Sequence, residues 1–97
     1  MMTRFTLDTP WGKADHYENL GQGIFTCSTP SHGGIFVPEE FLHNISPERR
    51  AEAARWSGSE QWYEEDCCWA YVAEALPGYF ASDVVDMARK LNAMRNV

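Results

Sequence analysis

The sequence predicts a single α+β domain over residues 1–97, in which a small antiparallel sheet packs against helices. The N-terminal half consists of short runs rich in β-branched and aromatic residues, separated by Gly and Pro, and this pattern favours strands joined by tight turns. The C-terminal half changes to a helical period. Strands that precede helices in this way are typical of an α+β fold with the helices on one face of the sheet.

About four strands are expected in the N-terminal half, and they form an antiparallel meander. The sequence RFTLD at 4–8 alternates apolar and polar residues, and TPWG after it is turn material. A second strand is predicted over 13–20. The segment IFTCST at 24–29 is the strongest strand prediction because it is rich in β-favouring residues. A last strand is expected over 35–37, after the turn TPSHGG.

The second half begins with two helical predictions. Residues 38–45 can form one helical turn, with Pro38 in its first turn. A clear helix is expected over 46–56, because Ser46 is a good N-cap, Pro47 suits the first helical position and an Ala-rich stretch follows.

Two longer helices complete the prediction of about three helices. The first covers 60–76, with acidic residues in its early turns that suit the positive end of the helix dipole, and Pro77 ends it. The second covers 83–95 after Ser82 as a cap. Its expected buried face consists of Val84, Met87, Ala88, Leu91 and Met94.

Composition limits the function. The chain is 44% hydrophobic and carries a net charge of −6, so it should fold and should not bind nucleic acid or an anionic membrane directly. No segment approaches the roughly 20 apolar residues of a membrane span, and no leader segment is expected because the first residues include no apolar run. The cysteines number three, two of them adjacent, which predicts reduced thiols and a cytoplasmic protein.

The adjacent pair Ser31 and His32 raises the possibility of nucleophilic catalysis. Neighbouring residues of an extended segment point to opposite faces, which argues against a direct Ser–His pair. Glu65 or Asp66 could orient the histidine, but no spacing selects either of them. The favoured interpretation is a turn, in which Ser31 bonds nearby backbone and the two glycines after His32 supply positive φ angles. A small hydrolase-like enzyme that uses His32 with Ser31 or a cysteine such as Cys67 remains the alternative.

Neither a metal site nor a cofactor is expected. No C-x-x-C, H-x-x-x-H or H-E-x-x-H spacing occurs, so a site would have to be assembled from distant positions. Cys67 and Cys68 are expected to be small core residues, and the four tryptophans are expected to pack in the core or at hinges. The residues that could supply ligands from distant positions are His16, His32, His43, Cys27, Cys67, Cys68 and Asp66.

Charge is segregated along the chain. Two stretches contain no Lys or Arg. Residues 14–48 contain five carboxylates, and residues 56–88 contain seven. Such segregation can create a negative surface that attracts a basic partner, although it can also be a solvated surface that aids solubility. Asp66 is expected to face inward. The predicted partner-binding residues are the acids expected to be exposed, Asp15, Glu18, Glu39, Glu40, Glu64 and Glu65.

Three motifs carry a family resemblance. TPWGKADH, STPSHGG and YEEDCCWAYVAEALP, in this order, resemble a family of small domains carried by phages, plasmids and other mobile elements. The similarity covers about residues 9–80. No activity is established for that family, so the resemblance implies no catalytic residue.

In length and acidity the chain is also similar to anti-CRISPR inhibitors of type I-F surveillance complexes. This resemblance implies a non-enzymatic DNA mimic that acts as a monomer in the host bacterial cell. It would dock in the basic DNA-binding cleft of the CRISPR surveillance ribonucleoprotein and block target DNA.

A third possibility is a structural domain that binds a protein through its aromatic surface.

Overall fold

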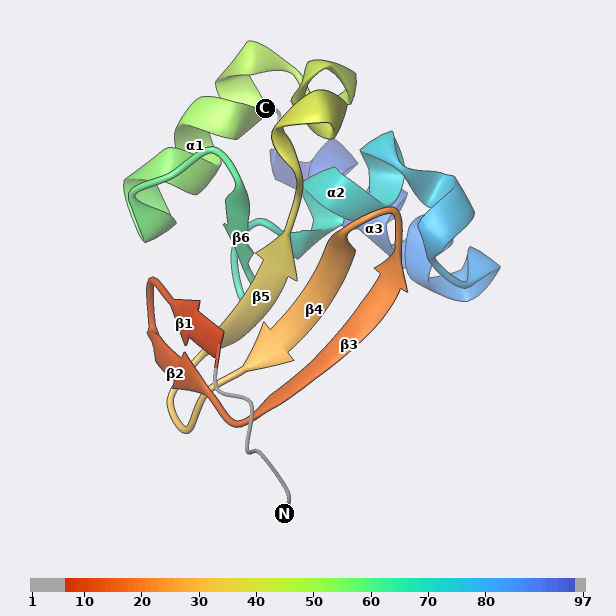
Figure 1. Ribbon diagram of the computed structural model, residues 1–97. Coiled ribbons are helices and arrows are strands. Elements are labelled where there is room, and N and C mark those ends of the chain that lie inside the picture. The colour runs from red at the N-terminus through yellow and green to blue at the C-terminus, as the bar shows by residue number, and fades with distance from the viewer. Residues whose placement is uncertain (1–6, 96–97) are drawn as a thin grey trace.

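The computed structural model describes residues 7–95 and confirms the α+β class (Figure 1). Its main sheet has four antiparallel strands in the order β3-β4-β5-β6. A separate two-stranded hairpin, β1-β2, precedes it. The strands are β1 (Leu7–Thr9), β2 (Gly12–Ala14), β3 (His16–Gly21), β4 (Ile24–Ser28), β5 (Gly33–Phe36) and β6 (Trp62–Glu64).

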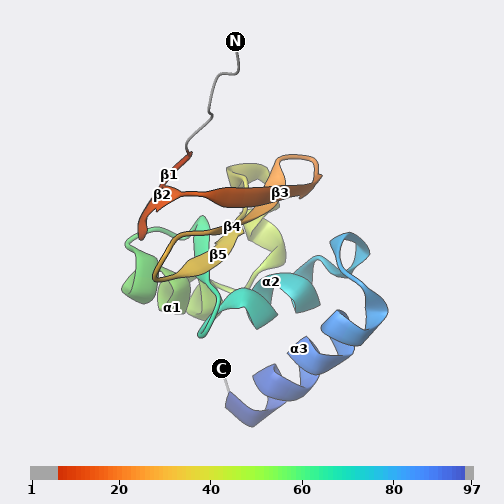
Figure 2. The ribbon, with the colours of Figure 1, turned by 90° about the horizontal axis from the view of Figure 1, so that it is seen from below.

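Within the described residues the rest of the domain consists of three α-helices and two 3₁₀ helices. Helices α1 and α2 pack against one side of the sheet, and α3 packs on α2 (Figure 2). No helix within residues 7–95 has both the length and the hydrophobicity to cross a bilayer. The helices are η1 (Glu39–Asn44), α1 (Pro47–Ser57), α2 (Trp69–Ala75), η2 (Pro77–Tyr79) and α3 (Ser82–Arg95).

Local signals correctly predicted α1 and the β4-β5 hairpin. The Ser46 side chain accepts a hydrogen bond from the Arg49 amide at 3.3 Å, and Pro47 occupies the first turn. Gly58 ends the helix in the left-handed conformation, with φ at 86°. The predicted turn at 38–45 is the 3₁₀ helix η1. These elements depend on interactions within a few residues of the chain, which sequence patterns describe well.

The predicted strand over 13–20 is divided in two. A bend at Asp15 separates β2 from β3, and the two strands belong to different sheets. Strand β1 overlaps only the end of the strand predicted over 4–8, whose first three residues lie outside the described part of the chain. The four strands of the main sheet are therefore not the four that were predicted.

The prediction of one helix over 60–76 is wrong in its first half. Trp62 to Glu64 form strand β6, residues 65–68 form a turn, and helix α2 begins only at Trp69. Strand β6 pairs with β5, with Tyr63 opposite Ile35. The aromatic residues of β6 favour a strand, and a partner strand about thirty positions earlier satisfies their backbone groups. The acids predicted for the start of this helix lie before it, and the first turn of α2 has none.

The buried face of α3 also differs from the prediction. Met87 and Met94 are 57% and 80% exposed, whereas Val85, Ala88 and Asn92 are buried. Ala88 packs against Ala70 and Ala73 of α2, and Asn92 donates a hydrogen bond to the Ala70 carbonyl at 3.0 Å. Small side chains let the two helices approach closely. The buried Asn92 nitrogen is satisfied by hydrogen bonds to Ala70 and Glu74, whereas its Oδ1 has no partner among the described residues.

The core lies between the helices and one face of the sheet. Tyr63 of β6 and Tyr71 of α2 are its largest fully buried side chains, surrounded by aliphatic residues from β4, β5 and α1. The guanidinium groups of Arg49 and Arg95 lie over the Tyr71 ring, 5.2 and 5.4 Å from its centroid. The core therefore joins α1 and α2 to the sheet, and Arg95 brings the end of α3 against Tyr71.

The hydroxyl of Tyr63 is buried and has no hydrogen-bond partner among the described residues. Burial is also the main reason that the pKa of Tyr63 is raised. We expect Tyr63→Phe to increase the free energy of unfolding by about 1 kcal/mol, because an unsatisfied buried polar group is removed. Urea denaturation would measure the change, with Tyr79→Phe on a half-buried side chain as the control. A loss of stability in Tyr63→Phe would contradict this expectation.

The opposite face of the sheet carries an aromatic cluster. Phe25 and Phe36 stack with their centroids 5.0 Å apart, and Trp62 meets Phe36 edge to face. Trp11, from the turn between β1 and β2, lies 5.8 Å from Trp62. Gly34 of β5 lies beneath the Trp11 ring, so the hairpin can pack directly on the sheet.

Candidate functional site

The segment TPSHGG forms a turn, and Thr29 organises it. The Thr29 amide and hydroxyl both donate to the His32 carbonyl, at 2.6 and 2.7 Å, and the hydroxyl accepts from the His32 amide at 3.0 Å. The predicted turn is therefore confirmed, but its chemistry differs from the prediction. Thr29 performs the role assigned to Ser31, and Gly33 and Gly34 belong to β5 without positive φ angles.

Strand β6 ends beside this turn and brings an acidic segment to His32. The Glu65 amide donates to the Gly33 carbonyl at 2.9 Å, which extends the pairing of β5 and β6 by one residue. The chain then turns, and the Asp66 amide donates to Glu64 Oε2 at 3.1 Å. The Glu64 side chain is consequently held in one orientation.

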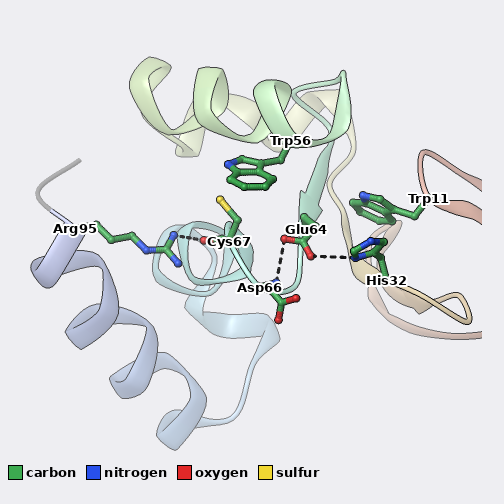
Figure 3. A pocket seen from close by; sticks show the side chains of 7 residues that line it. All are labelled: Trp11, His32, Trp56, Glu64, Asp66, Cys67 and Arg95. Carbon is green, nitrogen blue, oxygen red and sulfur yellow. Dashed lines mark hydrogen bonds and ion pairs between the residues drawn. The ribbon is translucent and has the colours of Figure 1, made fainter.

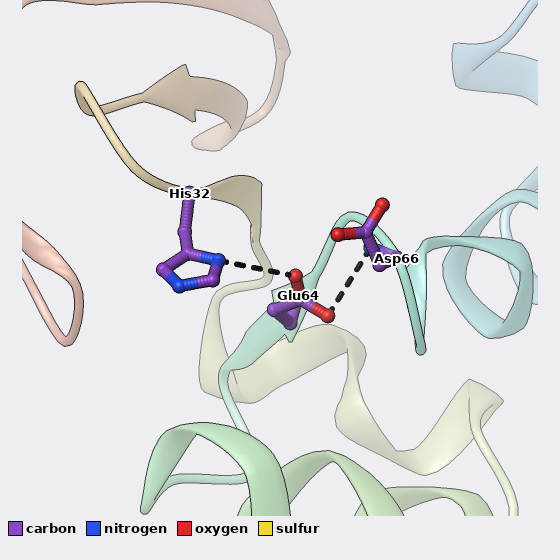
Figure 4. Close-up of side chains that lie close together, drawn as sticks. All are labelled: His32, Glu64 and Asp66. Atoms are coloured by element: carbon purple, nitrogen blue, oxygen red, sulfur yellow. Dashed lines mark hydrogen bonds and ion pairs between the residues drawn. The ribbon is translucent and has the colours of Figure 1, made fainter.

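His32, Glu64 and Asp66 form a compact group at the end of the sheet (Figure 4). His32 Nδ1 lies 3.8 Å from Glu64 Oε1, and one ligand atom from each of the three residues lies within 4.8 Å of the others. The Glu64 side chain is only 8% exposed, whereas that of His32 is 52% exposed. A buried carboxylate thus lies behind two surface side chains that can bind protons or metal ions.

The group lines a pocket of about 480 Å³ (Figure 3). Its lining comes from five separate parts of the chain: the β1-β2 turn, the β4-β5 turn, the ends of α1 and α3, and the segment around β6. Trp11 and Trp56 supply aromatic surface near the carboxylates, and Arg95 supplies a cation at the far side. The complete lining is Trp11, His32, Trp56, Glu64, Asp66, Cys67 and Arg95.

Cys67 shares the pocket, but its sulfur points toward Trp56 rather than toward His32 (Figure 3). The Cys67 and Cys68 sulfurs are 2.7 Å apart, and Arg95 donates to the Cys67 carbonyl. Cys68 is fully buried, and burial is the main reason that its pKa is raised. Cys67 is only partly buried, so the prediction that both are core residues holds for Cys68 alone.

The comparison with known families identifies the chain. A family model described as a domain of unknown function, DUF7007, matches residues 4–96. The chain belongs to this family. No curated protein and no solved structure shows significant similarity to it. Membership agrees with the expected resemblance to a family of small domains without an established activity, whereas the association with mobile elements stays a prediction.

In this DUF7007 domain, all three motifs that carry the resemblance meet at the pocket. STPSHGG contributes His32, and YEEDCCWAYVAEALP contributes Glu64, Asp66 and Cys67. The third motif, TPWGKADH, contributes Trp11. The residues that make the chain recognisable therefore surround one site, although they are spread over more than half of the sequence.

The predicted partner-binding acids are not gathered on one face of the DUF7007 domain. Asp15 and Glu65 lie at the end of the sheet where β5 begins, since their amides bond Ser28 and Gly33. Glu39 and Glu40 lie beyond the opposite end of β5 in η1. All four are exposed, as is Glu18 on β3.

For the two acids nearest the pocket, the expected exposure is reversed. Glu64 is 6% exposed and was expected on the surface, whereas Asp66 is exposed and was expected inside. The predicted helix and the observed strand direct the same residues to different sides. The position of Glu64 in β6 and of Asp66 after it therefore determines which side chain is exposed. Glu64 is consequently not available as a surface contact for a large partner.

The other potential metal ligands remain apart from the pocket, where the structure describes them. His16 and Cys27 lie within β3 and β4, and His43 lies in η1. Sequence reasoning singled out His32 and considered Glu65 or Asp66 as its neighbour. It missed the other lining residues Trp11, Trp56, Glu64 and Arg95. The adjacent aromatic residues Trp62 and Tyr63, which favour strands, were the signal that could have placed Glu64 on a strand.

Proposed function

We propose that the protein is a non-enzymatic inhibitor that binds a basic surface of another protein through exposed carboxylates. One observation carries this proposal. Within residues 7–95, none of five exposed acids of the predicted set takes part in an ion pair. These acids are Asp15, Glu18, Glu39, Glu40 and Glu65.

Several basic side chains are engaged within the domain itself. Lys13 pairs with Asp8, and Arg49 pairs with Glu74. Arg55 and Arg89 pair with acids on their own helices. Most of the carboxylates that make up the net charge of −6 lie outside these pairs. Such carboxylates create a long-range negative potential that steers a basic partner toward the surface.

The sharper form of the proposal names the partner. Carboxylates can occupy the positions of phosphates in a groove that binds DNA, and such a groove is lined by Lys and Arg. Small size and acidity resemble those of type I-F anti-CRISPR proteins, which supports a DNA mimic that blocks the DNA-binding cleft of a type I CRISPR surveillance complex. An inhibitor of this kind is stoichiometric and needs no cofactor.

A competition experiment tests the proposal. A purified type I-F surveillance complex is mixed with labelled target DNA and increasing amounts of the protein. We expect DNA binding to fall to zero near a one-to-one ratio, and inhibition to weaken as salt increases, because exposed charges are screened. The double variant Glu39→Lys/Glu40→Lys should weaken inhibition by about tenfold or more, as expected for loss of close charge pairs at an interface.

Asp83→Lys/Asp86→Lys on α3 is the matched control, because both residues are exposed acids outside the predicted set. Each reversal adds two charges, so both double variants change the net charge from −6 to −2. Asp15→Lys/Glu65→Lys would test the other end of the sheet in the same way. Undiminished DNA binding with excess protein, or equal effects of all three variants, would contradict the proposal. Inhibition that is insensitive to salt would favour the aromatic-surface alternative.

A second candidate, a hydrolase-like enzyme, is favoured by a different observation. His32 lies 3.8 Å from a buried carboxylate in a pocket that Cys67 also lines. A histidine oriented by a carboxylate is a common arrangement for general acid–base catalysis. However, Ser31 is exposed and its amide bonds Thr29, and the Cys67 sulfur points away from His32. The pocket therefore contains a base and its carboxylate without an aligned nucleophile.

The two candidates differ in stoichiometry. An enzyme would act at amounts far below those of its target, and His32→Ala would abolish its effect. The inhibitor proposed here would require at least one molecule for each target complex. Titration of the protein in the competition assay distinguishes these results directly.

A further inference from the structure

The group His32, Glu64 and Asp66 has chemistry that the inhibitor proposal does not use. We propose that these three residues form a binding site for a divalent transition-metal ion, with zinc as the preferred class. The site would have three protein ligands and an open position toward the pocket. This inference is independent of the acidic surface described above.

The first argument is the ligand set. One imidazole nitrogen and two carboxylate oxygens converge from the β4-β5 turn and from the end of β6 (Figure 4). Imidazole suits zinc and neighbouring transition metals, and carboxylates bind them at about 2.0–2.2 Å. Calcium and magnesium prefer oxygen ligands throughout, so the histidine selects against them.

The second argument is the environment of Glu64. Its side chain is 92% buried, since 8% is exposed, and it faces the pocket. Oε2 accepts the Asp66 amide, but Oε1 accepts no hydrogen bond from any described residue. Its one ion-pair partner among these residues, His32 at 3.8 Å, is charged only when protonated. A buried carboxylate is costly without a compensating cation, and a metal ion at this position would supply that charge.

The third argument concerns distances. Ligand atoms around a tetrahedral ion lie about 3.4 Å apart when the bonds are about 2.1 Å long. The separation of 3.8 Å between His32 and Glu64 is close to this value, and the widest separation in the group is at most 4.8 Å. His32 and Asp66 are exposed and Glu64 is held by backbone. Small rotations of the two surface side chains would therefore close the site around the fixed carboxylate.

The pocket provides the fourth position. Its volume of about 480 Å³ is open beside the three ligands, so a water molecule or a ligand atom could complete the coordination. Zinc sites with three protein ligands and one exchangeable position are typical of catalytic rather than structural zinc. The Cys67 sulfur turns toward Trp56 (Figure 3), so the proposed coordination contains no thiolate.

The experiment uses the full chain without an affinity tag that binds metal. After treatment with a chelator, the protein is titrated with Zn²⁺ by calorimetry, and its thermal unfolding is followed with and without Zn²⁺. Co²⁺ serves as a spectroscopic probe, because thiolate ligands give a near-ultraviolet charge-transfer band that nitrogen and oxygen ligands do not. We expect one bound ion, a higher Tm with Zn²⁺, and no thiolate band with Co²⁺.

Variants assign the site. His32→Ala and Asp66→Asn change surface side chains and should each weaken Zn²⁺ binding by more than about tenfold. Glu65→Gln, an exposed acid next to the site, is the matched control and should bind as the wild type does. Glu64→Gln should abolish binding while the apo protein keeps its stability or gains some, because an uncompensated buried charge is removed.

Four results would overturn the proposal: no Zn²⁺ binding by the wild type, equal weakening in Glu65→Gln, a thiolate band that disappears in Cys67→Ser, or undiminished binding in both His32→Ala and Asp66→Asn. Circular dichroism of each variant establishes that it is folded. Since the readout is metal binding, the result is separate from the success or failure of the competition assay for the inhibitor.

Discussion

Gly34→Ala is expected to lower the free energy of unfolding by about 3 kcal/mol. A Cβ atom at this position would lie 2.5 Å from the Tyr63 carbonyl oxygen and 2.5 Å from the Trp11 ring. The carbonyl belongs to the β5-β6 pairing and cannot move without breaking it, and the ring is held against Trp62. The substitution must therefore separate β6 or displace the β1-β2 hairpin.

Urea denaturation followed by tryptophan fluorescence would measure this loss. Gly78→Ala is the matched control, because a Cβ there would meet nothing within 4 Å and its φ angle is not positive. We expect the control to change stability by less than about 0.5 kcal/mol. Because Glu64 follows Tyr63 in β6, Gly34→Ala should also weaken any ligand binding at the pocket. A loss below about 1 kcal/mol would show that Trp11 moves aside and β6 is less constrained than the contacts indicate.

Glu74→Ala is expected to cost about 2 kcal/mol. The Glu74 carboxylate on α2 joins the other two helices, since Oε1 accepts from Arg49 of α1 at 3.0 Å and from Asn92 of α3 at 2.7 Å. Asn92 is 3% exposed, so its amide cannot exchange the lost bond for one to bulk water. Arg55→Ala removes an exposed pair within α1 and is the control, with an expected change below about 1 kcal/mol.

The same carboxylate predicts a pH dependence. The Asn92 hydrogen bond, assisted by Arg49, lowers the pKa of Glu74 in the folded protein. A lowered folded pKa contributes stability that is present above the unfolded pKa of glutamate, about 4.3, and is lost as the pH falls through the folded pKa. The stability difference between wild type and Glu74→Gln should therefore be largest near pH 7 and decrease below about pH 4. A difference that stays constant from neutral to acidic pH would contradict this role for Glu74.

Sequence patterns were sufficient for the elements that depend on local chemistry. The Ser46–Pro47 start of α1, the strand at 24–28 and the turn before His32 all follow from residues a few positions apart. In each case the stabilising interaction, a cap or a turn hydrogen bond, lies inside the segment that predicts it. The α+β class follows from the same local signals.

Strand β6 was decided by tertiary structure. The segment around Trp62 and Tyr63 contains enough helix-forming residues nearby to continue into α2, so local patterns alone predicted a helix. Pairing with β5 and burial of Tyr63 outweigh that preference, as tertiary contacts often outweigh intrinsic propensity. The buried face of α3 was misjudged for a related reason, because Asn92 is buried only where Ala70 and Glu74 offer hydrogen-bond partners.

At the candidate site too, local sequence patterns determined one part of the arrangement and tertiary contacts the other. The sequence by itself determined that His32 follows a tight turn and that a run of carboxylates lies about thirty residues later. Only the tertiary structure decided that Glu64, and not Glu65, faces His32. The physical reason is register: successive side chains of a strand point to opposite faces. The pairing of β5 with β6 determines which carboxylate is buried in the pocket and which reaches solvent.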